Sequence, residues 1–188
     1  MKRIDTAIPG AFVIEPSVFG DARGYFFESY HQEKFATFGI TKAFVQDNQS
    51  HSRRGVLRGL HYQLGRPQAK LVRALAGEIF DVAVDVRKGS PTFGNWVGER
   101  LSSDNKRMLY VPEGFAHGFL VLSEVAEILY KCTDLYTPTE ERGILWNSPE
   151  LGIPWPLASG IEPILSSRDI LYPTLASAPT SDLPECSP

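Results

Sequence analysis

Short segments rich in branched and aromatic residues, interrupted by glycine or proline, run through most of this 188-residue chain. The clearest, Glu78–Val86, alternates acidic residues and alanine with valine, which is the period of a β-strand. Helical signals are few, and we expect one short helix at His31–Phe38 and one turn at Ser102–Lys106. The segments that we predict as strands are Phe12–Ile14, Tyr25–Tyr30, Ala43–Asn48, Leu71–Leu75, Glu78–Val86, Asn95–Leu101, Arg107–Val111, Gly118–Leu122 and Ala126–Thr133. The pattern predicts a mainly β fold, as a sandwich, jelly roll or barrel.

Bulk charge excludes several classes of partner. The net charge is −3, so no global basic field predicts binding to nucleic acid or to a membrane surface. The N-terminus lacks the apolar core of a signal peptide, and charge or glycine breaks every apolar run. We therefore expect a cytoplasmic protein that holds any anionic substrate with a few placed cations.

The length predicts a single domain, which we place at residues 1–173. The last stretch, Thr174–Pro188, is rich in proline, serine, alanine and threonine without apolar periodicity, which predicts a flexible tail. Cys132 and Cys186 are the only cysteines, too few for a disulfide framework. A bridge between them is one possibility, and reduced thiols are the simpler interpretation.

Two polar residues interrupt an apolar, strand-like run at Val56–Tyr62. Arg58 and His61 lie inside it, where a buried charge is costly unless it is paired or used. The alternative is a solvated arginine at a strand end and a satisfied core histidine. Strand parity sends the two side chains to opposite faces, but Gly55 or Gly59 could supply a bulge that brings both to one cavity.

A second histidine, His117, follows a predicted strand and lies between Gly114 and Gly118. A metal-binding cupin would need two histidines one residue apart, yet Gln63 stands where the partner of His61 would be. Two histidines alone rarely hold zinc or iron. The sequence therefore predicts no metal, and it has no Gly-x-Gly-x-x-Gly fingerprint of a dinucleotide cofactor.

Two further residues have both a structural and a functional interpretation. Tyr130 shares a strand face with Ile128 and Cys132, so it should point inward, either as a core tyrosine or toward a cavity. Asp169 could orient a histidine, although a surface pair with Arg168 is the commoner arrangement. Taken singly, neither residue decides between the two interpretations.

Nine strings in collinear order, spanning about residues 5–173, resemble the dTDP-4-dehydrorhamnose 3,5-epimerase family. They are Gly20–Glu28, Gln46–Asn48, Gly55–Gln63, Gln68–Arg73, Ser90–Gly94, Val111–Phe119, Tyr130–Asp134, Glu141–Asn147 and Ser167–Asp169. The resemblance implies a cupin-type jelly roll, a homodimer, and no cofactor. It also implies a substrate, dTDP-4-dehydro-6-deoxy-D-glucose, inverted at C3 and C5.

The same resemblance implies roles for individual residues. His61 matches the base, Asp169 its carboxylate partner, and Tyr130 the proton donor. Lys70 and Arg58 match positions beside the keto oxygen, where cations would stabilise an enolate.

Substrate binding is implied for a wider set of residues. The remaining positions that we assign to it are Arg23, Glu28, Gln46, Asp47, Asn48, His117, Tyr136, Glu141 and Arg168. Arg168 stands where the family commonly carries lysine, and the segment around Arg23 reaches the neighbouring subunit in the family. The alternatives are an epimerase acting at C5 alone or C3 alone, and a non-catalytic cupin that binds sugar nucleotides.

Overall fold

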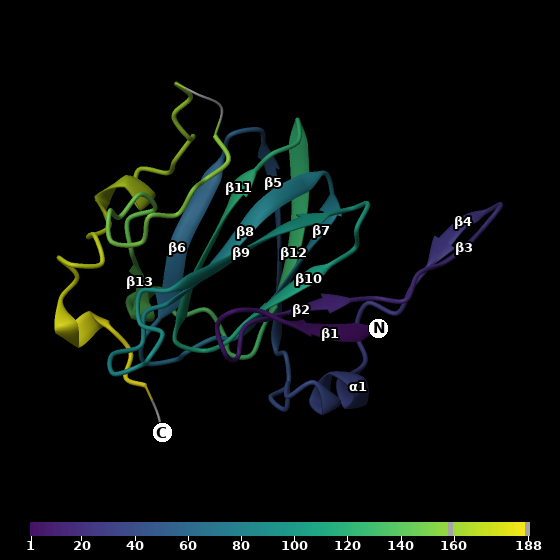
Figure 1. The fold of residues 1–188 in the computed structure, drawn as a ribbon, viewed down its shortest axis with the longest axis horizontal. Helices are drawn as coiled ribbons and strands as arrows, with labels where there is room; N and C mark the ends of the chain where they lie inside the picture. Colours follow the sequence, from purple (N-terminus) through teal and green to yellow (C-terminus); the bar gives the residue numbers. More distant parts are fainter. Residues whose placement is uncertain (158–159, 187–188) are drawn as a thin grey trace.

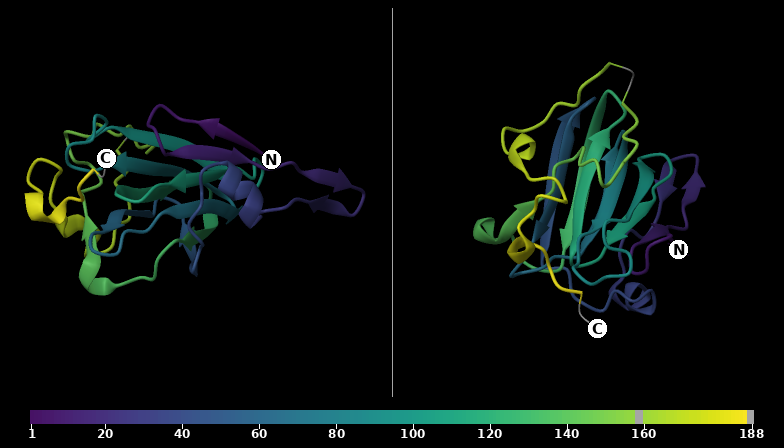
Figure 2. Two further views of the ribbon diagram at one scale, coloured as in Figure 1. Left: turned by 90° about the horizontal axis from the view of Figure 1, so that it is seen from below. Right: turned by 60° about the vertical axis from the view of Figure 1, so that its left-hand side comes forward.

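The computed structural model describes residues 1–157 and 160–186, and its main feature is a pair of antiparallel β-sheets (Figures 1 and 2). The larger sheet has the strand order β1 (Lys2–Asp5), β2 (Phe12–Glu15), β10 (Met108–Val111), β7 (Lys70–Ala76), β12 (Val125–Cys132) and β5 (Gln46–Arg53). The other has the order β13 (Glu141–Gly143), β6 (Leu57–Gln63), β11 (Phe115–Val121), β8 (Glu78–Asp85) and β9 (Trp96–Ser102). This arrangement confirms the prediction of a mainly β, jelly-roll type fold.

Elements outside the two sheets are short. A two-stranded hairpin, β3 (Phe19–Asp21) and β4 (Gly24–Phe26), extends away from the sheets (Figure 1). The predicted strand at 25–30 is wrong beyond Phe26, because Phe27 and Tyr30 leave the strand and pack in an aromatic cluster beside the first helix. That helix, α1, is shorter than predicted. The bounds of the helix and of the 3-10 turns are α1 (Gln32–Thr37), η1 (Pro138–Glu140), η2 (Asp169–Leu171) and η3 (Thr180–Asp182).

In the described ranges, no helix is long and apolar enough to cross a membrane.

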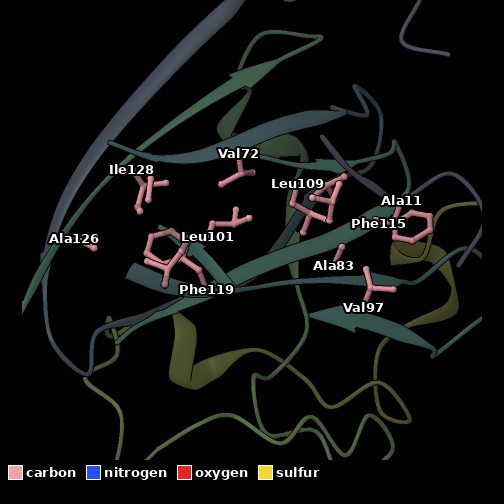
Figure 3. Close-up of a cluster of buried hydrophobic side chains, with 14 of the residues drawn as sticks. Ala11, Val72, Ala83, Val97, Leu101, Leu109, Phe115, Phe119, Ala126 and Ile128 are labelled. Atoms are coloured by element: carbon pink, nitrogen blue, oxygen red, sulfur yellow. The ribbon is translucent and has the colours of Figure 1, made fainter. Parts of the chain in front are cut away.

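The main hydrophobic core fills the space between the sheets (Figure 3). β12 contributes Ile128, β7 contributes Val72 and β11 contributes Phe119, each buried almost completely. In β8, Ile79 and Ala83 face this core, while Val82 and Val84 face the opposite side. Both faces of β8 are therefore buried, although acidic residues interrupt its apolar sequence.

The C-terminal segment covers the outer face of β8, and this contradicts the prediction of a tail without a packing role. Leu175 and Leu183 join a second core with Val82 and Val84. Glu185 forms a β-bridge with Lys88. The segment packs because an apolar sheet face needs a cover, whereas isolated leucines leave no periodic signal in the sequence. Residues 187–188 lie outside the described residues.

A bulge in β6 sets the geometry beneath the candidate site. His61 pairs with His117 on β11, but Arg58 pairs with Phe119, so β6 has one residue more than its partner across this interval. Gly59 has a φ of 116°, and a Cβ there would lie 2.5 Å from Cα of Gly118. The close approach requires glycine, and the predicted bulge is confirmed.

Candidate active site

A cavity of about 550 Å³ collects side chains from both sheets and from the segment around residues 164–169. The predicted site residues that line it are Gln46, Asn48, Arg58, His61, Lys70, His117, Tyr130, Tyr136, Glu141, Arg168 and Asp169. Cavities of this size are typical of small-molecule sites. Residues spread over more than 120 positions of the sequence are thus brought to one space.

His61 and Asp169 form the hydrogen-bonded pair that the sequence analysis anticipated. His61 Nε2 lies 2.6 Å from Asp169 Oδ1, and their side chains are 26% and 4% exposed. Burial opposes ionisation of Asp169, but the hydrogen bond with His61 holds the pKa of this carboxyl below its usual value. The carboxylate therefore accepts the Nε2 proton, which leaves Nδ1 of His61 as the basic atom. The ring of Tyr172 packs edge-on against His61, at 5.5 Å between centroids.

His117 is held by a second carboxylate, Asp81 on β8, which the sequence analysis missed. His117 Nε2 lies 2.7 Å from Asp81 Oδ1, and the two side chains are 6% and 0% exposed. Burial lowers the pKa of His117 more than the neighbouring carboxylate raises it, so the imidazole is neutral at pH 7. The alternation in β8 indicated which strand face carries Asp81, but that face points into the protein instead of toward solvent.

Tyr130 and Lys70 lie across the cavity from the two histidines, on strands of the larger sheet. Tyr130 faces inward between Ile128 and Cys132, as its strand parity predicted. Burial raises the pKa of Tyr130, so the phenol keeps its proton and can donate it. Burial also lowers the pKa of Lys70, which pairs in register with Cys132 on β12. A weak acid and a cation thus line the wall opposite the base.

Arg58 is the second cation in the cavity, and it is oriented by a residue that the sequence analysis did not single out. Its Nη2 donates to Oγ of Ser52 at 3.0 Å, and its Nε donates to the same oxygen at 3.2 Å. Because the partner is a neutral hydroxyl, the positive charge of Arg58 stays available to an anion in the cavity.

Glu141 is the centre of a polar cluster at the edge of the cavity. Its Oε1 pairs with Nη2 of Arg168 at 2.7 Å and accepts the Tyr172 hydroxyl at 3.1 Å. Its Oε2 accepts the Tyr136 hydroxyl at 2.5 Å, and this hydrogen bond raises the pKa of Tyr136. The cluster fixes one arginine and two aromatic rings together.

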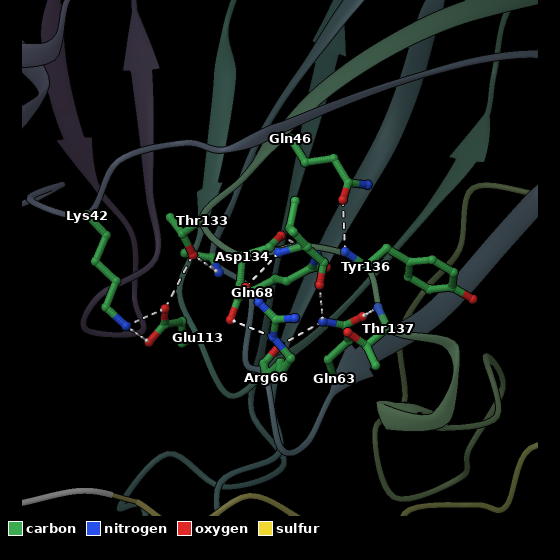
Figure 4. A network of polar contacts seen from close by, with 12 residues as sticks. Lys42, Gln46, Gln63, Arg66, Gln68, Glu113, Thr133, Asp134, Tyr136 and Thr137 are labelled. Atoms are coloured by element: carbon green, nitrogen blue, oxygen red, sulfur yellow. Dashed lines mark hydrogen bonds and ion pairs between the residues drawn. The ribbon is translucent and has the colours of Figure 1, made fainter.

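The loop that carries Tyr136 is held by two glutamines (Figure 4). The carbonyl oxygen of the Gln46 side chain accepts the backbone N–H of Tyr136 at 2.8 Å. The Gln63 side chain donates to the carbonyl of Arg66 at 2.8 Å and accepts the N–H of Thr137 at 2.6 Å. Gln63 therefore organises this loop, in a position where a metal-binding cupin would place a histidine.

Three predicted binding residues do not line the cavity. Arg23 is on the protruding hairpin, pairs with Asp21, and has a side chain that is 90% exposed. Glu28 pairs with Lys34 at 2.8 Å. Asp47 lies on the outer face of β5 and pairs with a lysine of β12. Within one chain these positions are separate from the site.

Comparisons with known proteins agree with this geometry. Residues 5–177 match the family model for dTDP-4-dehydrorhamnose 3,5-epimerase. The protein of that name from Pseudomonas aeruginosa is 61% identical over 170 residues, which are 90% of this chain and 93% of that protein. The crystal structure of dTDP-6-deoxy-D-glucose-3,5-epimerase from Legionella pneumophila, in complex with dTDP-4-keto-L-rhamnose, is 49% identical with a TM-score of 0.96, and the match covers 100% of this chain and 99% of that one.

A related activity also occurs on this fold. The structure of a 3′-monoepimerase from Streptomyces bikiniensis, in complex with dTDP-quinovose, is 37% identical with a TM-score of 0.90, covering 97% of this chain and 92% of that one. The family match extends over nearly the whole chain, and the more similar relatives carry the double-epimerase name. This chain belongs to the dTDP-4-dehydrorhamnose 3,5-epimerase family.

Proposed function

We propose that this chain is a dTDP-4-dehydrorhamnose 3,5-epimerase, which converts dTDP-4-dehydro-6-deoxy-D-glucose to dTDP-4-dehydro-L-rhamnose. The observation that supports it most is the presence of an oriented base and a protonated tyrosine in one cavity. His61 comes from one sheet and Tyr130 from the other, and both line the same space. Inversion of a carbon needs a proton removed on one face and another supplied on the opposite face.

The C4 ketone makes the protons on C3 and C5 acidic, so one base serves both carbons. Nδ1 of His61 takes the proton, and the carboxylate of Asp169 stabilises the imidazolium that forms. Lys70 and Arg58 stabilise the negative charge on the enolate oxygen. Tyr130 then donates a proton to the opposite face of the carbon, and solvent resets both groups before the second inversion.

The reaction needs no oxidation, and the proposal assigns it no cofactor. We place it in the cytoplasm, without a nucleic-acid or membrane partner. Arg168 is the proposed contact for the diphosphate, because a guanidinium binds phosphate oxygens with two parallel donors. Tyr136, fixed beside it through Glu141, is the proposed contact for the thymine ring.

A homodimer is part of the proposal. Phe19 and Phe26 on the hairpin β3–β4 are 66% and 70% exposed, an apolar pair that a second copy of the chain would cover. Arg23 and Glu28, which lie outside the cavity of their own chain, would then reach the cavity of the partner.

The main alternative is inversion at one carbon only, as the name of the Streptomyces relative indicates for that protein. A non-catalytic binder is disfavoured, because His61, Lys70, Tyr130 and Asp169 are all retained around the cavity.

The number of carbons that exchange is measured directly. Incubating the enzyme with the keto sugar nucleotide in heavy water should place deuterium at both C3 and C5, as read by NMR. Deuterium at one carbon alone would reject double epimerisation, and deuterium at neither would reject the epimerase proposal. A parallel sample treated with EDTA should exchange at the same rate, since no step is assigned to a metal.

A further inference from the structure

The end of the chain forms a strap across the outer face of the five-stranded sheet, opposite the cavity (Figure 1, yellow). Residues 178–186, which we call the C-terminal strap, lie beyond the family match, which ends at residue 177. Leu183 of the strap packs into the outer core. Beyond it, Lys88 donates its backbone N–H to the carbonyl of Pro184 at 2.7 Å and accepts that of Cys186 at 2.9 Å. The proposed reaction gives this strap no role.

Asp182 attaches the strap to two neighbouring strands of the sheet. Its backbone carbonyl accepts the hydroxyl of Tyr62 on β6 at 3.0 Å, and its Oδ1 accepts Nε of Arg142 on β13 at 2.9 Å. Tyr62 and Arg142 are themselves partners in register. One residue of the strap therefore holds β6 by its backbone and β13 by its side chain.

Arg142 connects this contact to the backbone of Glu141. Its Nη1 donates to the carbonyl of Glu141 at 3.0 Å and to the carbonyl of Thr139, in the turn η1, at 2.9 Å. β13 is an edge strand of three residues, so its own ladder supplies few hydrogen bonds. Because successive side chains of a strand point to opposite faces, Arg142 fixes from outside a strand whose Glu141 lines the cavity.

Glu141 carries the polar cluster to which the proposed function assigns the nucleotide. Its carboxylate holds Arg168, the proposed diphosphate contact, and Tyr136, the proposed thymine contact. A shift of the Glu141 backbone would therefore move both groups. The Arg142–Asp182 pair has side chains that are 31% and 34% exposed, and ion pairs of this kind add little to global stability. Its main effect should be on the geometry of β13.

We propose that Asp182 is a positioning residue for nucleotide binding, acting through Arg142 on the backbone of Glu141. The C-terminal strap thereby sets the nucleotide edge of the cavity from the opposite face of the sheet. This inference rests on the proposed function and deepens it, because it names a determinant of nucleotide affinity that lies outside the cavity. Since the base, His61, has no contact with the strap, the chemical step should be spared.

The first test compares two carboxylates of the strap. Asp182→Ala leaves the backbone carbonyl that Tyr62 bonds, so the strap stays attached. We expect the Kd for dTDP, measured by titration calorimetry, to rise roughly 3- to 10-fold. The KM for the keto sugar nucleotide should rise by a similar factor while kcat stays within about twofold of the wild type. Glu185→Ala, which removes the ion pair with Lys88, is the matched control and should leave Kd and KM unchanged.

A double-mutant cycle tests whether Asp182 acts through Arg142. Arg142→Ala should raise the Kd for dTDP at least as much as Asp182→Ala does, because it also removes the donors to two carbonyls. In the Arg142→Ala background, Asp182→Ala should then add less than about twofold. Hydrogen exchange of the backbone at residues 137–143 should be faster in Asp182→Ala and unchanged in Glu185→Ala.

The inference is wrong if Asp182→Ala binds dTDP as tightly as the wild type, or if Glu185→Ala weakens binding equally. It is also wrong if the effects of Asp182→Ala and Arg142→Ala multiply in the double variant. Failure of the proposed function is a different result, in which the wild type binds dTDP but does not turn over the keto sugar nucleotide. A wild type that binds no dTDP would reject the proposed nucleotide contacts and the inference with them.

Discussion

The two histidine–aspartate pairs share a cavity and a hydrogen-bond geometry, yet they differ in burial and in origin. The His61 side chain is 26% exposed and that of His117 is 6% exposed. A histidine that remains open to the cavity can take up a proton and exchange it with solvent. One that is enclosed beside other positive groups stays neutral. The two pairs have similar hydrogen bonds, and their different burial therefore explains their different roles.

The carboxylates of the two pairs also come from different kinds of structure. Asp81 belongs to β8, which pairs directly with the strand of His117. Asp169 belongs to a 3-10 turn, 108 residues after His61 in the sequence. The enclosed pair is built into the sheet, whereas the accessible pair joins the sheet to a loop. Removing one member of each pair should therefore have unequal consequences.

The largest difference is expected when the histidines themselves are replaced. His61→Ala should lower kcat by about 10²–10⁴-fold and nearly stop solvent exchange, since it removes the base. His117→Gln should cost only about tenfold in kcat/KM, since it removes a single contact. Turnover assays give kcat and kcat/KM for both variants, and NMR in heavy water gives their rates of deuterium exchange. Equal losses in the two variants would contradict the assignment of His61 as the base and His117 as a binding residue.

A smaller difference is expected for the carboxylate that orients the base. Asp169→Asn keeps the shape of the side chain but removes the charge that stabilises the imidazolium, and kcat should fall about 10–100-fold. The fall should appear in kcat, whereas the effect of Asp81→Asn should appear mainly in KM. Steady-state kinetics on the two variants measure both parameters. If both variants changed the same parameter, the two carboxylates would not have different roles.

The smallest effect is on stability in mild acid. Burial lowers the pKa of His117, so below pH ~6.5 the unfolded chain binds a proton that the folded chain does not. The free energy of unfolding should therefore decline as the pH falls below this value, and it should be fully retained above it. Urea unfolding at pH 7.5 and 5.5 should show a smaller decline for His117→Gln than for the wild type. The exposed-site variant His51→Gln is the control, and a decline in His117→Gln as large as in the wild type would contradict the expectation.

Most strands were predictable because apolar and polar residues alternate in them. The elements that were missed lack this pattern. β1 (Lys2–Asp5) is an exposed edge strand with a polar composition, and β13 (Glu141–Gly143) is too short to show a period. The packing of Leu175 and Leu183 was also missed, because two isolated leucines in a polar segment do not indicate which surface they cover.

The candidate site was predictable in composition but not in geometry. Periodicity placed Tyr130 on an inward face, and glycines near Arg58 predicted the bulge. His61 and Asp169 are 108 positions apart in the sequence, so local patterns could not predict their pairing. Only the resemblance of the collinear motifs to the family indicated it. Asp81 was overlooked because alternating polar residues in a strand usually face solvent, and here Asp81 is fully buried and pairs with His117.

Because Asp169 lies on a turn outside the two sheets, the enzyme can lose activity while the sheets stay folded. The turn is held by few strand hydrogen bonds, and local opening of such segments requires less energy than global unfolding. Opening it would disconnect the histidine from its carboxylate while every strand stayed paired. Warming or brief proteolysis would then abolish turnover before the β-sheet signal in circular dichroism changed. Turnover would therefore report on local opening of the turn that carries Asp169.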